Sequence, residues 1–180
     1  MAPITTTAEL RRSGIHSRKV LRHCAPLGSW QRLLPGVVLT TPSPPTRLDR
    51  LRAVLAFAGL SSVITGADAL VRQGAPLPLP RHIHVLGGTN ARRAHPWILL
   101  ERTSRPPDVV ERHGLRLAGA ARAAVDMARR ETNPRAVVQI LDAVMGARLC
   151  SPADLREEVA AGSRRGTALV RQALAHLYPT

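Results

Sequence analysis

The sequence predicts an α+β protein in two parts, a small basic module over residues 1–41 and a larger mixed α/β domain over residues 46–180. The first 41 residues alternate short helical and strand-like runs around glycine and proline turns. A Thr-Pro-Ser-Pro-Pro run at residues 41–45 makes a stiff linker. Beyond it, strand-like runs over residues 82–118 precede helical periodicity over residues 120–177. We therefore expect a small antiparallel sheet followed by C-terminal helices.

The first predicted element is a short helix that ends at Arg11 and Arg12. Thr6 or Thr7 can cap its start, because a hydroxyl oxygen there accepts a hydrogen bond from a free backbone N–H group. Gly14 then supplies the positive φ angle that a sharp turn between two helices needs.

A second, basic helix is predicted from Ser17 to Cys24. Ser17 is placed to cap it, and we expect Val20 and Leu21 to point inward. A helix that enters the major groove of DNA needs cations on its outer face. The outward residues of this helix are Arg18, Lys19, Arg22 and His23.

Residues 30–33 and 37–39 have strand character, and the Pro35-Gly36 dipeptide between them is a turn signal. Helix, turn, basic helix and hairpin is the order of a winged helix-turn-helix, so the module is expected to bind duplex DNA through its second helix and its wing. A solvated basic face without a DNA partner is the alternative interpretation. The residues expected at the DNA interface are Arg11, Arg12, Ser17, Arg18, Lys19, Arg22 and Arg32.

The run SGIHSRKVLRHCAPLGSWQRLLPGVVL over residues 13–39 resembles the winged-helix module of actinobacterial AbiEi-like proteins. That family is the antitoxin and transcriptional-regulator half of type IV toxin-antitoxin systems. Relatives carry histidine and an aromatic residue where this chain has Leu34 and Val38. The family hairpin, G-x-W-x-R-hydrophobe-x-P-G-V, is matched by Gly28, Trp30, Arg32, Leu33, Pro35, Gly36 and Val37.

Relatives begin with one more helix before the threonines, and only Met1 to Ile4 precede them here. We therefore expect either a start codon further upstream or a decayed module that is underpacked for want of its first helix.

Composition favours a polyanionic partner. The chain has 26 Lys and Arg against 12 Asp and Glu, a net charge of +14. Aromatic residues are only 2% of the chain, which argues against proteins that stack single-stranded bases. Cys24 and Cys150 are isolated, which fits a reduced cytoplasm. No apolar run approaches the length of a membrane span, so no membrane partner is expected.

The helix predicted after Thr46 carries apolar residues on one face and arginines on the other. The next helix is predicted to open with a Thr65 to Asp68 capping box and to end at Gln73. The inward residues of the first helix are Leu48, Leu51, Leu55 and Ala58, and the outward ones are Arg47, Arg50 and Arg52.

Residues 82–86 alternate with period two and predict a strand. A second strand at residues 97–102 is expected to pair with it in antiparallel fashion. Arg92 and Arg93 then lie in the connecting loop, as a solvated turn or a phosphate contact. Residues 109–115 extend this sheet by a hairpin around a His-Gly turn.

Four helices are predicted at the C-terminal end. The first spans residues 120–130, and the next two open with the capping signals Asn133-Pro134 and Ser151-Pro-Ala-Asp. The last spans residues 165–177, with the inward residues Leu169, Val170, Leu174 and Leu177.

The body resembles the AbiEi-like family too, because Asp108-Val109 and Gly114-Leu115 match the D-V and G-L pairs of one family pattern, and Arg122 and Asp126 match the ends of its R-T-x-x-D pattern. Ala118 and Ala123 stand where the family carries threonines. Arg122 and Asp126 share one helix face, and the plain interpretation is a structural ion pair, worth about 0.3 to 0.5 kcal/mol when exposed. The resemblance implies a nucleotidyltransferase-like toxin as partner, and the body is expected to hold a partner or to form a homodimer.

No enzymatic site is predicted. The chain has no glycine-rich phosphate loop and no nucleophile beside a base. His82 and His84 lack a third metal ligand, and Glu157-Glu158 is expected on a solvated face. We therefore expect a non-enzyme without a cofactor or metal.

Two alternatives to the regulator remain open. Related architectures often carry a Vsr-like nuclease domain beyond the point where this chain ends, at Thr180, so one alternative is a nuclease-less stub of such a relative. The other is a protein-interaction domain that does not bind DNA.

Overall fold

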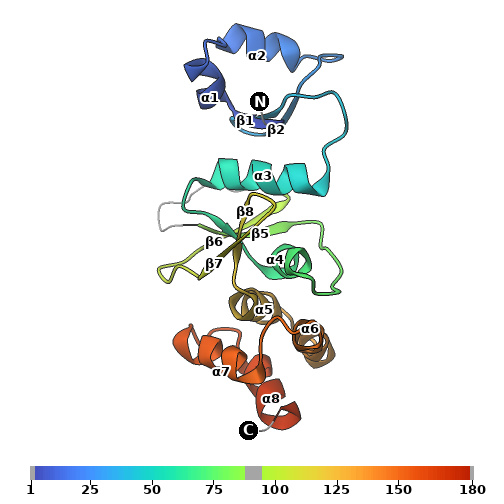
Figure 1. Cartoon of the computed structure of the whole chain (residues 1–180), viewed down its shortest axis with the longest axis vertical. Helices are drawn as coiled ribbons and strands as arrows, with labels where there is room; N and C mark the ends of the chain where they lie inside the picture. The colour runs from blue at the N-terminus through green and yellow to red at the C-terminus, as the bar shows by residue number, and fades with distance from the viewer. Residues whose placement is uncertain (1–2, 88–94, 179–180) are drawn as a thin grey trace.

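The computed structural model describes residues 3–87 and 95–178, which contain a three-stranded sheet, a five-stranded sheet and eight helices. The elements stack in layers along the long axis, with α1 and α2 at one end and α7 and α8 at the other (Figure 1). The α+β class expected from the sequence is confirmed. No helix in the described part of the chain is long and apolar enough to cross a membrane.

The first layer, called the head below, is an antiparallel sheet with two short helices. The sheet has the order β1-β3-β2, and β1 was not predicted. Its elements are β1 (Ile4–Thr6), α1 (Thr7–Arg12), α2 (Ser17–His23), β2 (Gln31–Leu34) and β3 (Val37–Leu39).

Local signals in the head account for most of its turns and caps. Thr6, one of the two threonines expected as the cap, caps α1 and forms a capping box with Glu9. Gly14 has a φ of 79°, as predicted. The expected cap of α2 is wrong by one residue, because His16 holds the cap position without a side-chain hydrogen bond and Ser17 is the first helical residue.

The inner face of α2 is narrower than predicted. Val20 is buried and packs with Leu10 and Val38, but Leu21 is 57% exposed. A seven-residue helix presents one turn to this small core, and Leu21 is rotated by about 100° from Val20. The expectation that both residues point inward is therefore wrong for Leu21.

The sheet of the head is covered on both faces. Val38 faces the core below α1 and α2, whereas Leu34 and Val37 belong to the large core on the side of α3 (Arg47–Ala58). Figure 1 shows α3 between the two sheets. Strand β1 begins at Ile4 and includes Thr5 and Thr6, and α3 covers the second face of the sheet.

The second sheet has the strand order β6-β5-β4-β8-β7 and is mixed rather than antiparallel. β5 runs parallel to β6 and β4 parallel to β8, while the other two pairs are antiparallel. The strands are β4 (Val63–Ile64), β5 (Ile83–Gly87), β6 (Ile98–Arg102), β7 (Val109–Arg112) and β8 (Leu115–Ala118).

The antiparallel pairing predicted for β5 and β6 is therefore wrong. All five residues of β5 are buried, because α3 covers one face and α4 the other, and strands buried on both faces are typical of parallel sheets. The predicted hairpin around His113-Gly114 is confirmed as β7 and β8. Arg92 and Arg93 lie outside the described residues.

Helix α5 is the centre of the C-terminal layers, since it packs against α4, α6 and α7. The caps predicted at Asn133 and Ser151 are confirmed, but Leu177 is 52% exposed rather than inside. The remaining helices are α4 (Gly66–Gln73), α5 (Ala120–Ala128), α6 (Pro134–Gly146), α7 (Pro152–Ala161) and α8 (Ala168–Leu177).

Candidate functional site

All the basic side chains of the head are exposed. Among the residues that the structure describes, no carboxylate lies within 4.0 Å of any of these nitrogen atoms, so none forms an ion pair. We call this set the basic head surface. It consists of Arg11 and Arg12 from α1, Arg18, Lys19 and Arg22 from α2, and Arg32 from β2.

The one acidic residue of this segment, Glu9, is occupied by the cap of α1. Its carboxylate accepts hydrogen bonds from the backbone N–H of Thr6 (2.8 Å) and from the hydroxyls of Thr5 and Thr6. These bonds, the one from the Thr6 backbone first, lower the pKa of Glu9, and the charge of Arg12 adds to the effect. The positive potential of the head is therefore opposed by a single carboxylate that is already bonded.

The basic helix is fixed to the hairpin at its C-terminal end. The ring of His23 stacks on Trp30 with centroids 4.5 Å apart, and the backbone N–H of Trp30 donates to the carbonyl of His23 (3.0 Å). A Cβ atom on Gly28 would lie 2.0 Å from the same carbonyl oxygen, so only glycine fits there. The position of α2 relative to β2 thus depends on Gly28 and Trp30.

The hairpin motif separates into structural residues and one exposed cation. Gly36 has a φ of 78° in the turn, Val37 is buried, and Leu33 packs on the core. Gly28 and Trp30 hold α2 as described above. Arg32 is exposed and forms no hydrogen bond or ion pair with any described residue, which leaves it available for a ligand.

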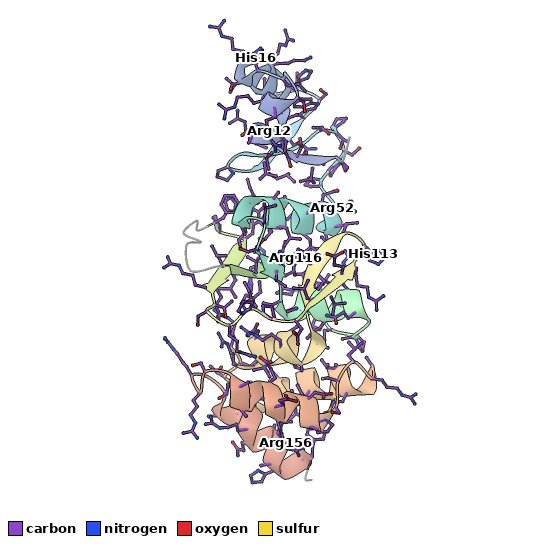
Figure 2. All side chains as sticks on the ribbon, turned by 60° about the vertical axis from the view of Figure 1, so that its left-hand side comes forward. Arg12, His16, Arg52, His113, Arg116 and Arg156 are labelled. Carbon is purple, nitrogen blue, oxygen red and sulfur yellow. The ribbon has the colours of Figure 1, made fainter. Side chains whose placement is uncertain are left out.

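The predicted interface residues fall into groups. Arg11 and Arg12 lie in the last turn of α1, and Arg32 lines a different hollow, beside the β2–β3 turn. His16 lies at the end of the molecule furthest from the C-terminal helices, above Arg12 (Figure 2). The residues that line one surface hollow together with His16 are Ser17, Arg18, Lys19 and Arg22.

A second convergence of charges is buried in the body. Asp126 accepts hydrogen bonds from Arg122 Nε (2.9 Å) and from the hydroxyl of Thr65 (2.9 Å). The structural pair between Arg122 and Asp126 is present as predicted, but the side chains are 8% and 1% exposed. The small energy of an exposed pair therefore does not apply, because α4 and α7 both pack against α5 and bury the two side chains.

Three further sequence expectations fail at or near this cluster. Thr65 and Asp68 form no capping box, because Thr65 bonds to Asp126 and Asp68 pairs with Arg47 (2.6 Å). Arg47 is therefore not a solvated residue of α3. Glu158 does not lie on a solvated face either, since it accepts from Arg105 Nη1 (3.1 Å) and approaches Arg122 Nε at 3.6 Å.

Arg105, Arg122, Asp126 and Glu158 line a cavity of about 290 Å³, called the polar cavity below. Arg122 also donates to the carbonyl of Arg105 (3.3 Å) and to the hydroxyl of Thr103 (3.4 Å). Sequence patterns missed the cavity because its lining comes from three separate segments, and only Arg122 and Asp126 are related by a local spacing. The segments are residues 102–105, residues 122–129 of α5, and residues 158–167.

His84 and its neighbours do not form a metal site. His84 is buried, its Nε2 lies 3.2 Å from Glu101, and burial lowers its pKa to about 4. His82 is exposed and precedes β5. Within residues 3–87 and 95–178, no three His, Cys, Asp or Glu side chains are grouped closely enough to hold a metal ion.

Comparison with known proteins supports the fold alone. No family model matches the chain, and no curated protein matches it. The crystal structure of the RV2827C protein from Mycobacterium tuberculosis is similar, with a TM-score of 0.61 over 96% of this chain and 71% of that chain. The two sequences are 17% identical. The likeness covers both sheets and the C-terminal helices, so the arrangement of layers is shared with a solved protein.

Proposed function

We propose that this protein is a regulator that binds duplex DNA through its head, with residues 1–41 acting as a winged helix-turn-helix. The observation that carries the proposal is the basic head surface, where six exposed cations on two helices and a hairpin lack any carboxylate partner among the described residues. Duplex DNA is the polyanion that such a helix and hairpin fit.

The order of elements supports this assignment. Helices α1 and α2 are joined by the turn at Gly14, and the β2–β3 hairpin follows in the place of a wing. In such motifs the second helix enters the major groove and the first one braces the backbone. The roles follow from position. From α2, with Ser17 at its start, base edges and phosphates are reached by Arg18, Lys19 and Arg22. Arg11 and Arg12 contact phosphates from α1, and Arg32 contacts a phosphate or the minor groove.

The exposure of Leu21 gives independent support. Leu21 lies three residues after Arg18, on the same side of α2, and is 57% exposed. An apolar side chain among cations on a groove-binding helix contacts the methyl group of thymine. Arg18 and Leu21 together then supply one polar and one apolar contact to the bases.

The resemblance of the hairpin and of the body to AbiEi-like proteins extends the proposal. We propose a cytoplasmic antitoxin-like regulator that controls the transcription of its own operon. Its partner would be a nucleotidyltransferase-like toxin, and the body would hold that partner or a second copy of the chain. No reaction is assigned to the protein itself.

The test is a salt titration of binding to duplex from the upstream region of the gene and to random duplex. The triple variant Arg18→Gln, Lys19→Gln, Arg22→Gln removes three cations from α2. Because each phosphate contact contributes about 0.9 to the slope of log affinity against log salt, we expect the slope to fall by roughly 2 to 3. Binding should also lose its preference for the upstream sequence.

The matched control removes the same charge from the other end of the molecule. Arg135, Arg148 and Arg171 are exposed on or next to α6 and α8, and their replacement by glutamine should leave the slope and the preference unchanged. Equal losses of slope and preference in both triple variants would show that net charge alone accounts for the binding. Negligible duplex affinity of the unaltered protein at moderate salt would favour a protein-interaction domain instead.

A further inference from the structure

The polar cavity lies at an edge of the five-stranded sheet where two parallel strands end. The backbone N–H of Thr103, directly after β6, donates to the carbonyl of Gly87 at the end of β5 (3.1 Å). Helix α5 and the last turn of α7 close the cavity from the other side. Sheets with parallel strands bind ligands outside the carboxyl ends of those strands. The position of the cavity is therefore one where ligand sites occur.

The lining is polar and carries an excess of cations. Among the described lining residues there are four arginines, two carboxylates and four hydroxyl groups, and the carboxylate of Glu101 pairs with Arg129 from outside the lining. Beside the cavity, the charges of Arg130 and Arg165 add to burial in lowering the pKa of Arg129. The lining residues with charge are Arg102, Arg105, Arg122, Arg129, Asp126 and Glu158, and those with hydroxyls are Thr103, Ser104, Ser163 and Thr167.

Carboxylates hold at least three of the four arginines in place, and for Arg129 the partner is Glu101, outside the cavity lining. Asp126 is bonded by Arg122 and by Thr65, which is outside the cavity lining, and Glu158 lies between Arg105 and Arg122. The guanidinium groups are thereby fixed before any ligand arrives, which reduces the entropy lost on binding. A purely structural role does not need this arrangement, because apolar residues of similar volume often stabilise a core as well as a buried charge cluster does.

We propose that the polar cavity binds a small phosphorylated molecule. Guanidinium groups bind phosphate oxygens in a bidentate manner. The hydroxyls of Thr103 and Thr167 already donate to backbone carbonyls, so the hydroxyls of Ser104 and Ser163 are the ones that would donate to the remaining oxygens. The volume of about 290 Å³ lies at the lower end of ligand pockets, and the described lining has no aromatic ring on which a nucleobase could stack. The ligand is therefore of the size of a sugar phosphate, and the site is separate from the DNA-binding head.

The test is isothermal titration calorimetry of the full chain with ribose 5-phosphate and with inorganic phosphate at constant ionic strength. Ser104 is exposed at the cavity, and its side chain forms no hydrogen bond with any described residue, so its replacement leaves the buried network intact. Ser104→Asp adds a negative charge there, and Ser104→Asn introduces a side chain of nearly the same size and shape as aspartate but without the charge. We expect one saturable site that Ser104→Asp weakens at least tenfold and that Ser104→Asn weakens far less, because the amide of asparagine can donate a hydrogen bond in place of the hydroxyl.

The head supplies the second control, because a protein of net charge +14 attracts anions over its whole surface. The triple variant of Arg18, Lys19 and Arg22 should bind ribose 5-phosphate as the unaltered chain does. Heats without saturation for both probes, equal affinities in the Asp and Asn variants, or loss of binding in the head variant would each overturn the proposal. The outcome is independent of DNA binding, because the DNA titration reports on different residues.

Discussion

The head and the body use arginine in opposite ways. In the head, arginines on α1, α2 and β2 are exposed and lie beyond ion-pairing distance of any described carboxylate. In the body, Arg122 is 8% exposed and is bonded to Asp126, to Thr103 and to the carbonyl of Arg105. Arginine thus offers an unpaired charge to a ligand in the head and forms part of a buried network in the body.

This difference shows where charge contributes to stability and where it does not. An exposed cation without a partner adds almost nothing to the free energy of unfolding, whereas a buried charge is tolerated only when it is paired and hydrogen-bonded. The head has a small separate core of Leu10, Val20 and Val38, and α3 joins its sheet to the large core of the body. Substitutions in the two layers should therefore separate binding from stability.

The largest effect on stability is expected from Asp126→Ala. The substitution leaves the guanidinium of Arg122 without its main partner in a buried position and the hydroxyl of Thr65 without an acceptor. Breaking one side of a buried pair destabilises by about 3 to 5 kcal/mol. Urea denaturation followed by far-ultraviolet circular dichroism measures the loss.

Arg18→Ala is the matched control in the head, and its effect on unfolding should stay within about 0.5 kcal/mol because the side chain is exposed. The double variant Arg122→Met, Asp126→Leu should recover part of the stability lost in Asp126→Ala, since neither charge then remains buried alone. A loss below about 1 kcal/mol for Asp126→Ala would mean that water reaches the pair, and the contrast between the layers would fail.

An intermediate effect is expected from Gly28→Ala in the head. The added Cβ would lie 2.0 Å from the carbonyl oxygen of His23, so the backbone between α2 and β2 must move. Overpacking of this kind costs about 1 to 3 kcal/mol. Amide hydrogen exchange of β2 and β3 should rise, and affinity for duplex DNA should fall because α2 loses its fixed position relative to Arg32.

The same substitution at Gly146 is the control. That glycine ends α6, and a Cβ there meets no atom within 4 Å, so alanine should be neutral or slightly stabilising. Unchanged exchange in the Gly28→Ala variant would show that the hairpin does not hold α2.

What the sequence predicted well was encoded within a few residues. The caps at Thr6, Thr46 and Ser151 each pair a hydroxyl with an acidic side chain three residues later, and all three form capping boxes. The same spacing at Thr65 and Asp68 failed, because partners from α3 and α5 hold both side chains. A local signal gives the right answer only when no distant group takes the same atoms.

The two candidate sites also differ in whether a local signal in the sequence reveals them. The cations of the head are visible in the sequence, because a short segment carries six of them with one carboxylate. The polar cavity depends on Arg105 and Glu158, which are 53 residues apart, and on the parallel pairing of β5 and β6. No periodicity or spacing in the chain encodes either, since both result from the packing of layers.

The smallest effect on stability, and the sharpest separation of binding from folding, is expected from Leu21→Ala. Leu21 is 57% exposed, so the free energy of unfolding should change by less than about 0.5 kcal/mol. If α2 lies in the major groove, the lost apolar contact should weaken binding to upstream duplex by about 1 kcal/mol, a fivefold increase in Kd, with little change in the salt slope.

The control is Leu177→Ala, at a leucine 52% exposed on α8, which should change neither the free energy of unfolding nor the affinity for DNA. Fluorescence anisotropy and urea denaturation on the two variants measure both. A loss of stability in Leu21→Ala with unaltered DNA binding would place this leucine in a packed interface, and α2 could then not be the helix that contacts DNA.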